Sequence, residues 1–338
     1  MNRPLLQSPL LAVLLGIFVA SCTPEEPTIN SFDDRWRLLA SDGASLSLYA
    51  MPDGSTQRTD VWVGGSSANI VEFRDQLYVM PTTDPWIVIL DRTTLLALDT
   101  INMDTLGTVS DIAFANATTA YAVHTDKNLV SVIDITTNQT VRTIQVGDGA
   151  HSIAALGNQL AVACSRANIV QIIDSRTNVV EASIGVPEVP YYVRASIATT
   201  EFVVVSLGTG KLDAAAQSSP KISFVNASTR ELIGGVELSF RVADALEQFP
   251  KGLVVTSSGF AYVPVQSGVL RVNARQRNKA TLVIRSSFSN IGYSPSRAEV
   301  MLLREDEPVV EVWDEVAANQ KAKVIMRANP GAFIALPR

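Results

Sequence analysis

A repeat with a period of about forty residues runs through this sequence and limits the folds that it can adopt. Residues 128–138 and 168–178 agree in pattern at nearly every position. Both segments begin with Asn, continue as an apolar strand, reach an Asp and end in Thr-Asn. Each is followed by a second β-rich segment, at residues 140–146 and 180–186. The chain is therefore expected to build one small unit of short strands several times over.

Weaker copies of the same strand recur along the chain, at residues 87–91, 222–226, 269–273 and 309–314, and residues 45–50 carry it without an acidic end. The position that ends the strand is occupied in turn by Ala50, Asp91, Asp134, Asp174, Asn226, Asn273 and Asp314. Their spacings are 41, 43, 40, 52, 47 and 41 residues, the period of a four-stranded propeller blade. No window shows a convincing helical period. These copies predict an all-β fold, a seven-bladed β-propeller of four-stranded antiparallel blades.

The turn residues and the two ends of the repeat region fit this prediction. An Asp or Asn side chain accepts backbone N–H bonds two residues on, so these residues are expected to start turns and to be structural. The first copy begins at about Arg35 and leaves no room for an innermost strand. The chain ends in an apolar strand at residues 331–336. We expect that strand to complete blade 1 and close the ring, making residues 35–338 one domain without a free sheet edge.

The first residues have the features of an export signal. Arg3 precedes an apolar stretch from Leu10 to Ala20, which is too short for a membrane span of about 20 residues. Residues 1–21 are therefore predicted to be a signal peptide. Residues 19–22, Val-Ala-Ser-Cys, resemble a bacterial lipobox, which implies cleavage before Cys22 and acylation of its thiol. Several acyl chains would anchor the protein stably in a membrane. The alternative is an ordinary signal peptide that Cys22 merely follows.

Residues 22–34 read as an acidic, proline-containing tether with too little apolar content to pack. Its pair Glu25-Glu26 resembles the surface-export signals of Bacteroidetes lipoproteins. The expected location is the outer membrane, with the propeller exposed to the periplasm or the cell surface. Loss of residues 1–21 removes one positive charge, Arg3, and changes the formal net charge from −6 to −7. That charge, without a basic stripe, argues against a nucleic-acid partner.

Residues 130–147 and 170–186 resemble the YVTN-type β-propeller repeat of surface-layer and YncE-like exported proteins. The resemblance is close in these two blades and loose in the others. It implies a seven-bladed propeller outside the cytoplasm. It implies no particular ligand, because propellers serve as enzymes, receptors and scaffolds.

Residues suited to catalysis or metal binding are scarce. Propeller enzymes of the quinoprotein, copper or haem kinds take metal ligands from several histidines, and this chain has two, His124 and His151. It has no Cys-x-x-Cys, no Cys-x-x-Cys-His and no Gly-x-Ser-x-Gly motif. Cys164 lies in an apolar run and is expected to be a small buried hydrophobic residue. We therefore expect no catalytic residue, no metal site and no cofactor.

The longest connections indicate where a ligand would bind. Counting the strands of a blade as a to d from the axis outwards, the b–c and d–a connections share one face, here called the top face. Residues 208–220, 240–252 and 187–192 fall on it, and long loops are uncommon unless they bind something. The predicted binding residues are Tyr191, Tyr192, Arg194, Lys211, Phe240, Arg241 and Phe249, with His151, Arg166 and Trp86 as second-rank candidates.

Aromatic side chains with a few cations suit a large, partly apolar, partly anionic ligand or the hot spot of a protein interface. The alternative is that Tyr191, Phe240 and Phe249 only cover the core beneath the loops. Our first hypothesis is a non-catalytic binding lipoprotein that captures a ligand for an outer-membrane transporter or holds a partner protein. Exported YVTN-like lipoproteins of Bacteroidetes include cobalamin-capturing receptors, so a corrinoid is one candidate ligand. The alternatives are a propeller enzyme, such as a lactonase-like hydrolase or a redox subunit, and an outer-membrane assembly scaffold.

Overall fold

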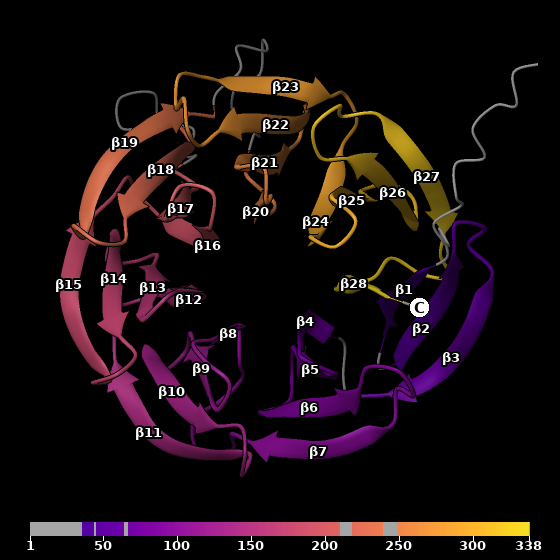
Figure 1. Cartoon of the computed structure of the whole chain (residues 1–338), viewed down its shortest axis with the longest axis horizontal. Coiled ribbons are helices and arrows are strands. Elements are labelled where there is room, and N and C mark those ends of the chain that lie inside the picture. Colours follow the sequence, from indigo (N-terminus) through magenta and orange to yellow (C-terminus); the bar gives the residue numbers. More distant parts are fainter. Residues whose placement is uncertain (1–35, 44, 64–66, 210–217, 239–248, 338) are drawn as a thin grey trace, which may run out of the picture. The chain divides into compact units, whose positions relative to one another are not determined.

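The structure is a computed structural model that describes residues 36–43, 45–63, 67–209, 218–238 and 249–337. Within residues 35–338 these segments form seven antiparallel sheets of four strands each. The sheets follow one another around a central axis as the blades of a propeller (Figure 1). The prediction of an all-β, seven-bladed β-propeller is confirmed. A search of the same segments for a helix long and apolar enough to cross a membrane finds none.

From the innermost strand outwards, blade 1 contains β28 (Phe333–Leu336), β1 (Trp36–Asp42), β2 (Ser45–Met51) and β3 (Thr56–Trp62). Blade 2 contains β4 (Ser67–Phe73), β5 (Gln76–Pro81), β6 (Trp86–Asp91) and β7 (Ala97–Asn102). Blade 3 contains β8 (Asp111–Phe114), β9 (Thr119–His124), β10 (Leu129–Asp134) and β11 (Gln139–Gln145). Blade 4 contains β12 (Ala150–Leu156), β13 (Gln159–Cys164), β14 (Ile169–Asp174) and β15 (Val179–Gly185).

Blade 5 contains β16 (Pro190–Ser196), β17 (Glu201–Ser206), β18 (Lys221–Asn226) and β19 (Glu231–Glu237). Blade 6 contains β20 (Val254–Val255), β21 (Phe260–Val265), β22 (Gly268–Asn273) and β23 (Ala280–Ile284). Blade 7 contains β24 (Phe288–Ser294), β25 (Glu299–Arg304), β26 (Val309–Asp314) and β27 (Gln320–Ile325).

Ring closure occurs in blade 1, as predicted. The last strand, β28, pairs antiparallel with β1, from Ala40 opposite Phe333 to Arg37 opposite Leu336. Ser41 extends the pairing, because its backbone N–H donates to the Ala332 carbonyl over 2.8 Å. The two ends of the propeller domain therefore share one sheet, and blade 1 has its innermost strand only when both ends are present.

The hydrophobic core is a series of layers between neighbouring blades. Strand β17 is buried at all six positions, whereas the outer strand β11 buries only Ile144. One cluster joins Leu46 of blade 1 to Leu77 and Val79 of blade 2, and another joins Phe224 of blade 5 to Val263 of blade 6. Each blade thus depends on its two neighbours for cover, as in other repeat folds. Cys164 is buried in one of these layers, as expected, and burial raises the pKa of its thiol to about 12.

The repeated Asp and Asn residues start turns, as predicted. The Asp134 carboxylate accepts the backbone N–H of Thr136 over 2.8 Å, and the Asn226 side chain accepts that of Ser228 over 2.9 Å. Asp91, Asp174, Asn273 and Asp314 make the same bond. These turns join strands c and d on the face opposite the top face, so the repeated acidic residues lie away from the predicted binding region.

Candidate functional site

Two adjoining cavities lie along the central channel. The first has a volume of about 430 Å³ and is lined by all seven blades at the starts of their innermost segments, so it opens on the top face; we call it the upper mouth. The second, of about 840 Å³, is lined by the middles and ends of the same strands; we call it the lower chamber. The residues that line both are Asn69, Asp111, Arg194, Leu253, Ile291 and Phe333. The cavities therefore meet at a waist.

The register of the sheets brings one position of each blade to the upper mouth. To find this position in a blade, we take the residue of strand c that lies four places before the turn residue, then its partner in strand b, and then the partner of that residue in strand a. In blades 1, 2 and 6 the pairing has to be extended by one or two residues to reach it. Its occupants are Asn69, Asp111, Ser152, Tyr192, Gly252, Asn290 and Ala332, and all of them line the mouth. Blades 2 to 5 therefore supply a polar side and blades 1 and 6 contribute small residues.

Local bulges add further side chains to this ring. The pairing of strands a and b shifts by one residue just before the same position in blades 2, 4, 5 and 7. The additional residues in blades 4, 5 and 7 are His151, Tyr191 and Ser289, and each lines the mouth. A β-bulge re-aims a side chain that regular alternation would direct elsewhere. The bulges thus place His151 and Tyr191 beside the ring rather than between blades.

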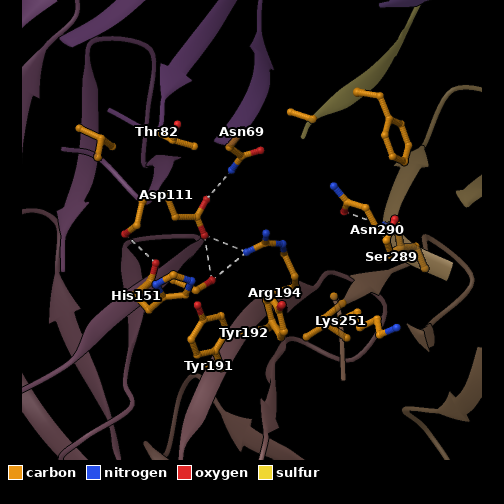
Figure 2. A pocket seen from close by; sticks show the side chains of 18 of the residues that line it. Asn69, Thr82, Asp111, His151, Tyr191, Tyr192, Arg194, Lys251, Ser289 and Asn290 are labelled. Atoms are coloured by element: carbon orange, nitrogen blue, oxygen red, sulfur yellow. Dashed lines mark hydrogen bonds and ion pairs between the residues drawn. The ribbon is translucent and has the colours of Figure 1, made fainter. Parts of the chain in front are cut away.

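A buried carboxylate joins four blades at the waist. Asp111 is 5% exposed and accepts hydrogen bonds from Asn69 Nδ2 over 3.1 Å, from Ser152 Oγ over 2.8 Å and from Arg194 Nη1 over 3.0 Å (Figure 2). The backbone N–H groups of Ile112 and Ile153 complete its shell, each over 3.1 Å. A buried carboxylate is stable only when it is paired and hydrogen-bonded, and Asp111 has both kinds of partner.

Of the three guanidinium nitrogens of Arg194, Nη1 is hydrogen-bonded within the protein and the other two are accessible to a ligand. Its Nη1 donates to Asp111, to Ser152 Oγ over 2.9 Å and to the Val193 carbonyl over 2.8 Å. Its Nε and Nη2 have no hydrogen-bond partner among the described residues, and 36% of the side chain is exposed. A guanidinium held at one nitrogen and open at two others is oriented to donate to an anionic or carbonyl group of a ligand.

Three aromatic rings form a platform next to Arg194. The rings of His151 and Tyr191 have centroids 3.8 Å apart and are tilted by 36°, and Tyr192 meets Tyr191 edge-on at 4.9 Å. Burial lowers the pKa of His151, although Asp111 acts in the opposite direction, so its imidazole is neutral at pH 7. Burial raises the pKa of both tyrosines, that of Tyr192 to about 12. The platform is therefore uncharged and suits a flat, apolar group.

Four of the predicted residues come together at the upper mouth: Tyr191, Tyr192, Arg194 and His151. Phe249 is 41% exposed and lines neither cavity. Arg166 pairs with Asp148 over 2.8 Å on the surface. Trp86 packs on the core between blades 1 and 2. Lys211, Phe240 and Arg241 lie outside the described residues.

The sequence prediction missed Asn69, Asp111 and Ser152. A signal for them exists, since they stand 22, 23 and 22 residues before Asp91, Asp134 and Asp174. Extending the repeat alignment upstream would have shown three polar residues at one position of three consecutive blades. The other histidine, His124, is buried and bonds to the Gly107 carbonyl and to Ser131 Oγ. In the part of the chain that the structure describes, no three His, Cys, Asp or Glu residues are grouped to hold a metal ion.

Comparisons with known proteins bear on the fold. No protein-family model matches the sequence, and no curated protein matches it either. The structure is similar to hydrazine synthase of Kuenenia stuttgartiensis, with a TM-score of 0.65 and 15% identity over 79% of this chain and 88% of that one. It is also similar to apo AztD of Citrobacter koseri, with a TM-score of 0.58 and 12% identity over 89% of this chain and 98% of that one. At such identities the likeness shows that the chain shares the β-propeller fold.

Proposed function

We propose that this protein is a non-catalytic binding protein that captures a small ligand in the upper mouth of its channel. The observation that carries the proposal is the uncharged platform of His151, Tyr191 and Tyr192 beside the open side of Arg194. A volume of about 430 Å³ falls within the range of about 300–1,000 Å³ for small-molecule sites. Such sites combine apolar walls with oriented polar groups; here the aromatic platform, Leu253, Ile291 and Phe333 supply the apolar part, and more than half of the lining residues are polar.

The chemistry of the mouth favours a ligand with a flat apolar part and an acidic or carbonyl group. The flat part would lie on Tyr191, and the polar group would accept hydrogen bonds from Arg194 Nε and Nη2. Asn290 and Lys251 line the far side of the mouth, but Asn290 Nδ2 donates to the Gly331 carbonyl over 3.0 Å and Lys251 Nζ is paired with Glu305 over 2.6 Å, so Arg194 is the main donor for a ligand. A corrinoid is large for this volume, so it would have to extend beyond the mouth onto the top-face connections.

We also propose that the protein is an exported lipoprotein with YVTN-type blades. Supporting this are the lipobox at residues 19–22, the short apolar stretch before it and the acidic tether after it. The anchor on Cys22 would keep the protein at the outer membrane, facing the periplasm or the cell surface. An outer-membrane transporter is then a fitting recipient for the ligand, and the net negative charge makes nucleic acid a poor partner.

The anchor is tested by Cys22→Ser in cells fed a radiolabelled fatty acid. We expect loss of acyl labelling, together with an unprocessed or soluble protein, because the serine hydroxyl cannot replace the thiol as acyl acceptor. Cys164→Ser is the matched control, since Cys164 is fully buried and should not affect labelling. Normal labelling of the Cys22→Ser protein would refute the anchor.

The ligand site is tested by Tyr191→Ala. The protein is first purified from the cells that make it, and the co-purified small molecule is identified by mass spectrometry and absorbance; a corrinoid would be evident from its spectrum. Removing the central ring of the platform should weaken binding of that molecule by about thirtyfold, which corresponds to about 2 kcal/mol. Tyr191 is preferred to Tyr192, because Tyr192 also packs on the core between blades 5 and 6.

Lys127→Ala is the control for Tyr191→Ala, because Lys127 is exposed on the b–c connection of blade 3 and lines neither cavity. Both variants should keep the melting temperature of the wild type, and calorimetric titration gives the two affinities. Equal affinity of the Tyr191→Ala protein and the wild type would refute the site. Purification of a partner protein without any small molecule would favour the scaffold hypothesis.

A further inference from the structure

The lower chamber has the features of a second binding site. Its volume of about 840 Å³ is about twice that of the upper mouth. Small residues in the innermost strands leave this space open: Ala113, Ala154, Ala155, Ala195, Gly292 and Ala335. At its lower rim the rings of Phe73 and Phe114, from blades 2 and 3, stack in parallel with centroids 4.1 Å apart. Both rings are partly exposed and line the chamber, so an apolar guest would meet an aromatic wall.

The three arginines that line the chamber differ in their ion pairing. Three arginines and two acidic residues line the chamber. Arg92 is paired with Glu72 over 2.6 Å and Arg194 with Asp111 over 3.0 Å. Arg74 makes no hydrogen bond or ion pair with any described residue, and its guanidinium carbon lies 5.6 Å from the centroid of the Phe73 ring. The unpaired positive charge of the chamber therefore stands directly beside its aromatic wall.

The backbone at Arg74 indicates which substitution this position tolerates. Arg74 and Asp75 form the two-residue turn between β4 and β5, and Arg74 has a φ of 58°. The matching turn of blade 4 places Gly157 at that position, with a φ of 60°. Glycine adopts this left-handed conformation without a steric penalty, whereas arginine does not. Eleven other described non-glycine residues also have a positive φ, so the conformation is a property of the turns, and it makes glycine the suitable substitution at Arg74.

We propose that the lower chamber binds an anion with an aromatic body, at a site separate from the upper mouth. The body lies against Phe73 and Phe114, and the acidic group pairs with Arg74. Arg194 at the waist is already paired with Asp111, whereas Arg74 is the chamber-lining arginine that has no ion pair with a described residue. This site does not depend on the one proposed for the upper mouth.

The test uses two fluorescent probes that share one aromatic body: 1-anilinonaphthalene-8-sulfonate and the uncharged N-phenyl-1-naphthylamine. Wild-type protein should bind both, and Arg74→Gly should weaken binding of the sulfonate about tenfold while leaving the uncharged probe unchanged. The same variant should keep or raise the melting temperature, because glycine suits the φ at this turn. Arg275→Gly is the control for loss of an exposed arginine charge, since Arg275 lies in a turn on the same face and lines neither cavity.

A second variant tests the position of the aromatic body. Ala155→Phe fills part of the chamber and should reduce binding of both probes, with the melting temperature reporting on folding. The site is refuted if the wild type binds neither probe, if Arg74→Gly affects both equally, or if Ala155→Phe affects neither. It is also refuted if Tyr191→Ala, and not Arg74→Gly, abolishes sulfonate binding, because the probe would then occupy the upper mouth. Failure of the proposed function would instead appear only in titrations of the co-purified ligand.

Discussion

Deletion of residues 331–338 should unfold the whole propeller rather than loosen one blade. The deletion removes β28, the innermost strand of blade 1, and leaves the edge of β1 unpaired. It also removes Phe333 and Leu336, which are 8% and 1% exposed and belong to the layers on either side of blade 1. Loss of these buried side chains alone costs roughly 5 kcal/mol at about 1.5–3 kcal/mol each, and single domains are stable by about 5–15 kcal/mol.

Calorimetry distinguishes unfolding of the whole propeller from the loosening of a single blade. The truncated protein should show either no cooperative transition or one at a greatly lowered temperature, with the exposed strand edge promoting aggregation. Two single substitutions, one at a buried and one at an exposed position, give reference values for the loss of stability. Leu336→Ala should cost about 2–4 kcal/mol, whereas Ile325→Ala, at a 71% exposed position of β27, should change stability by less than about 0.5 kcal/mol. A truncated protein with the full melting temperature would mean that β28 does not close the ring.

Asp111→Ala should be among the most destabilising substitutions in the channel, at about 3–5 kcal/mol. It leaves Arg194 at the waist without its carboxylate, and it removes the acceptor of the Ile112 and Ile153 N–H groups. Unpaired groups of this kind bear the full penalty of desolvation. The variant also frees Arg194 Nη1, so ligand binding at the upper mouth should change with it.

Asp148→Ala is the control for Asp111→Ala. Asp148 also pairs with an arginine, Arg166, over 2.8 Å, but both side chains are more than half exposed. Surface pairs contribute about 0–1 kcal/mol. Urea unfolding at pH 7 should therefore separate the two variants by at least about 2 kcal/mol. Equal losses would show that the Asp111 network contributes no more than a surface ion pair, and Arg194 would then lack a rigid support.

The fold could be predicted from the sequence because one period of the repeat corresponds to one blade. The turn residues Asp134 and Asp174 occupy equivalent positions in successive blades, and their spacing can be read without knowing how the side chains pack. Ring closure could be predicted because the first repeat lacks its innermost strand and the last repeat is followed by one extra strand. Both predictions depend only on the number of strands. An error of one residue in the register does not change that number.

The site was less predictable because it depends on register. Asp111 is the one polar residue of the short strand β8. Its side-chain partners Asn69, Ser152 and Arg194 come from three other blades. His151 lines the mouth through a bulge, and period-two alternation contains no sign of an extra residue. Trp86 illustrates the converse: it begins β6 after a top-face connection, yet its side chain packs between blades.

A crystal structure of the protein, purified from its own cells without removal of bound molecules, would show directly whether the upper mouth holds a ligand. We predict electron density for a small ligand in the upper mouth, with a flat group on Tyr191 and a polar atom within about 3 Å of Arg194 Nε or Nη2. Density for the ligand at any other place, with the upper mouth holding only ordered water, would rule out the upper mouth as the binding site.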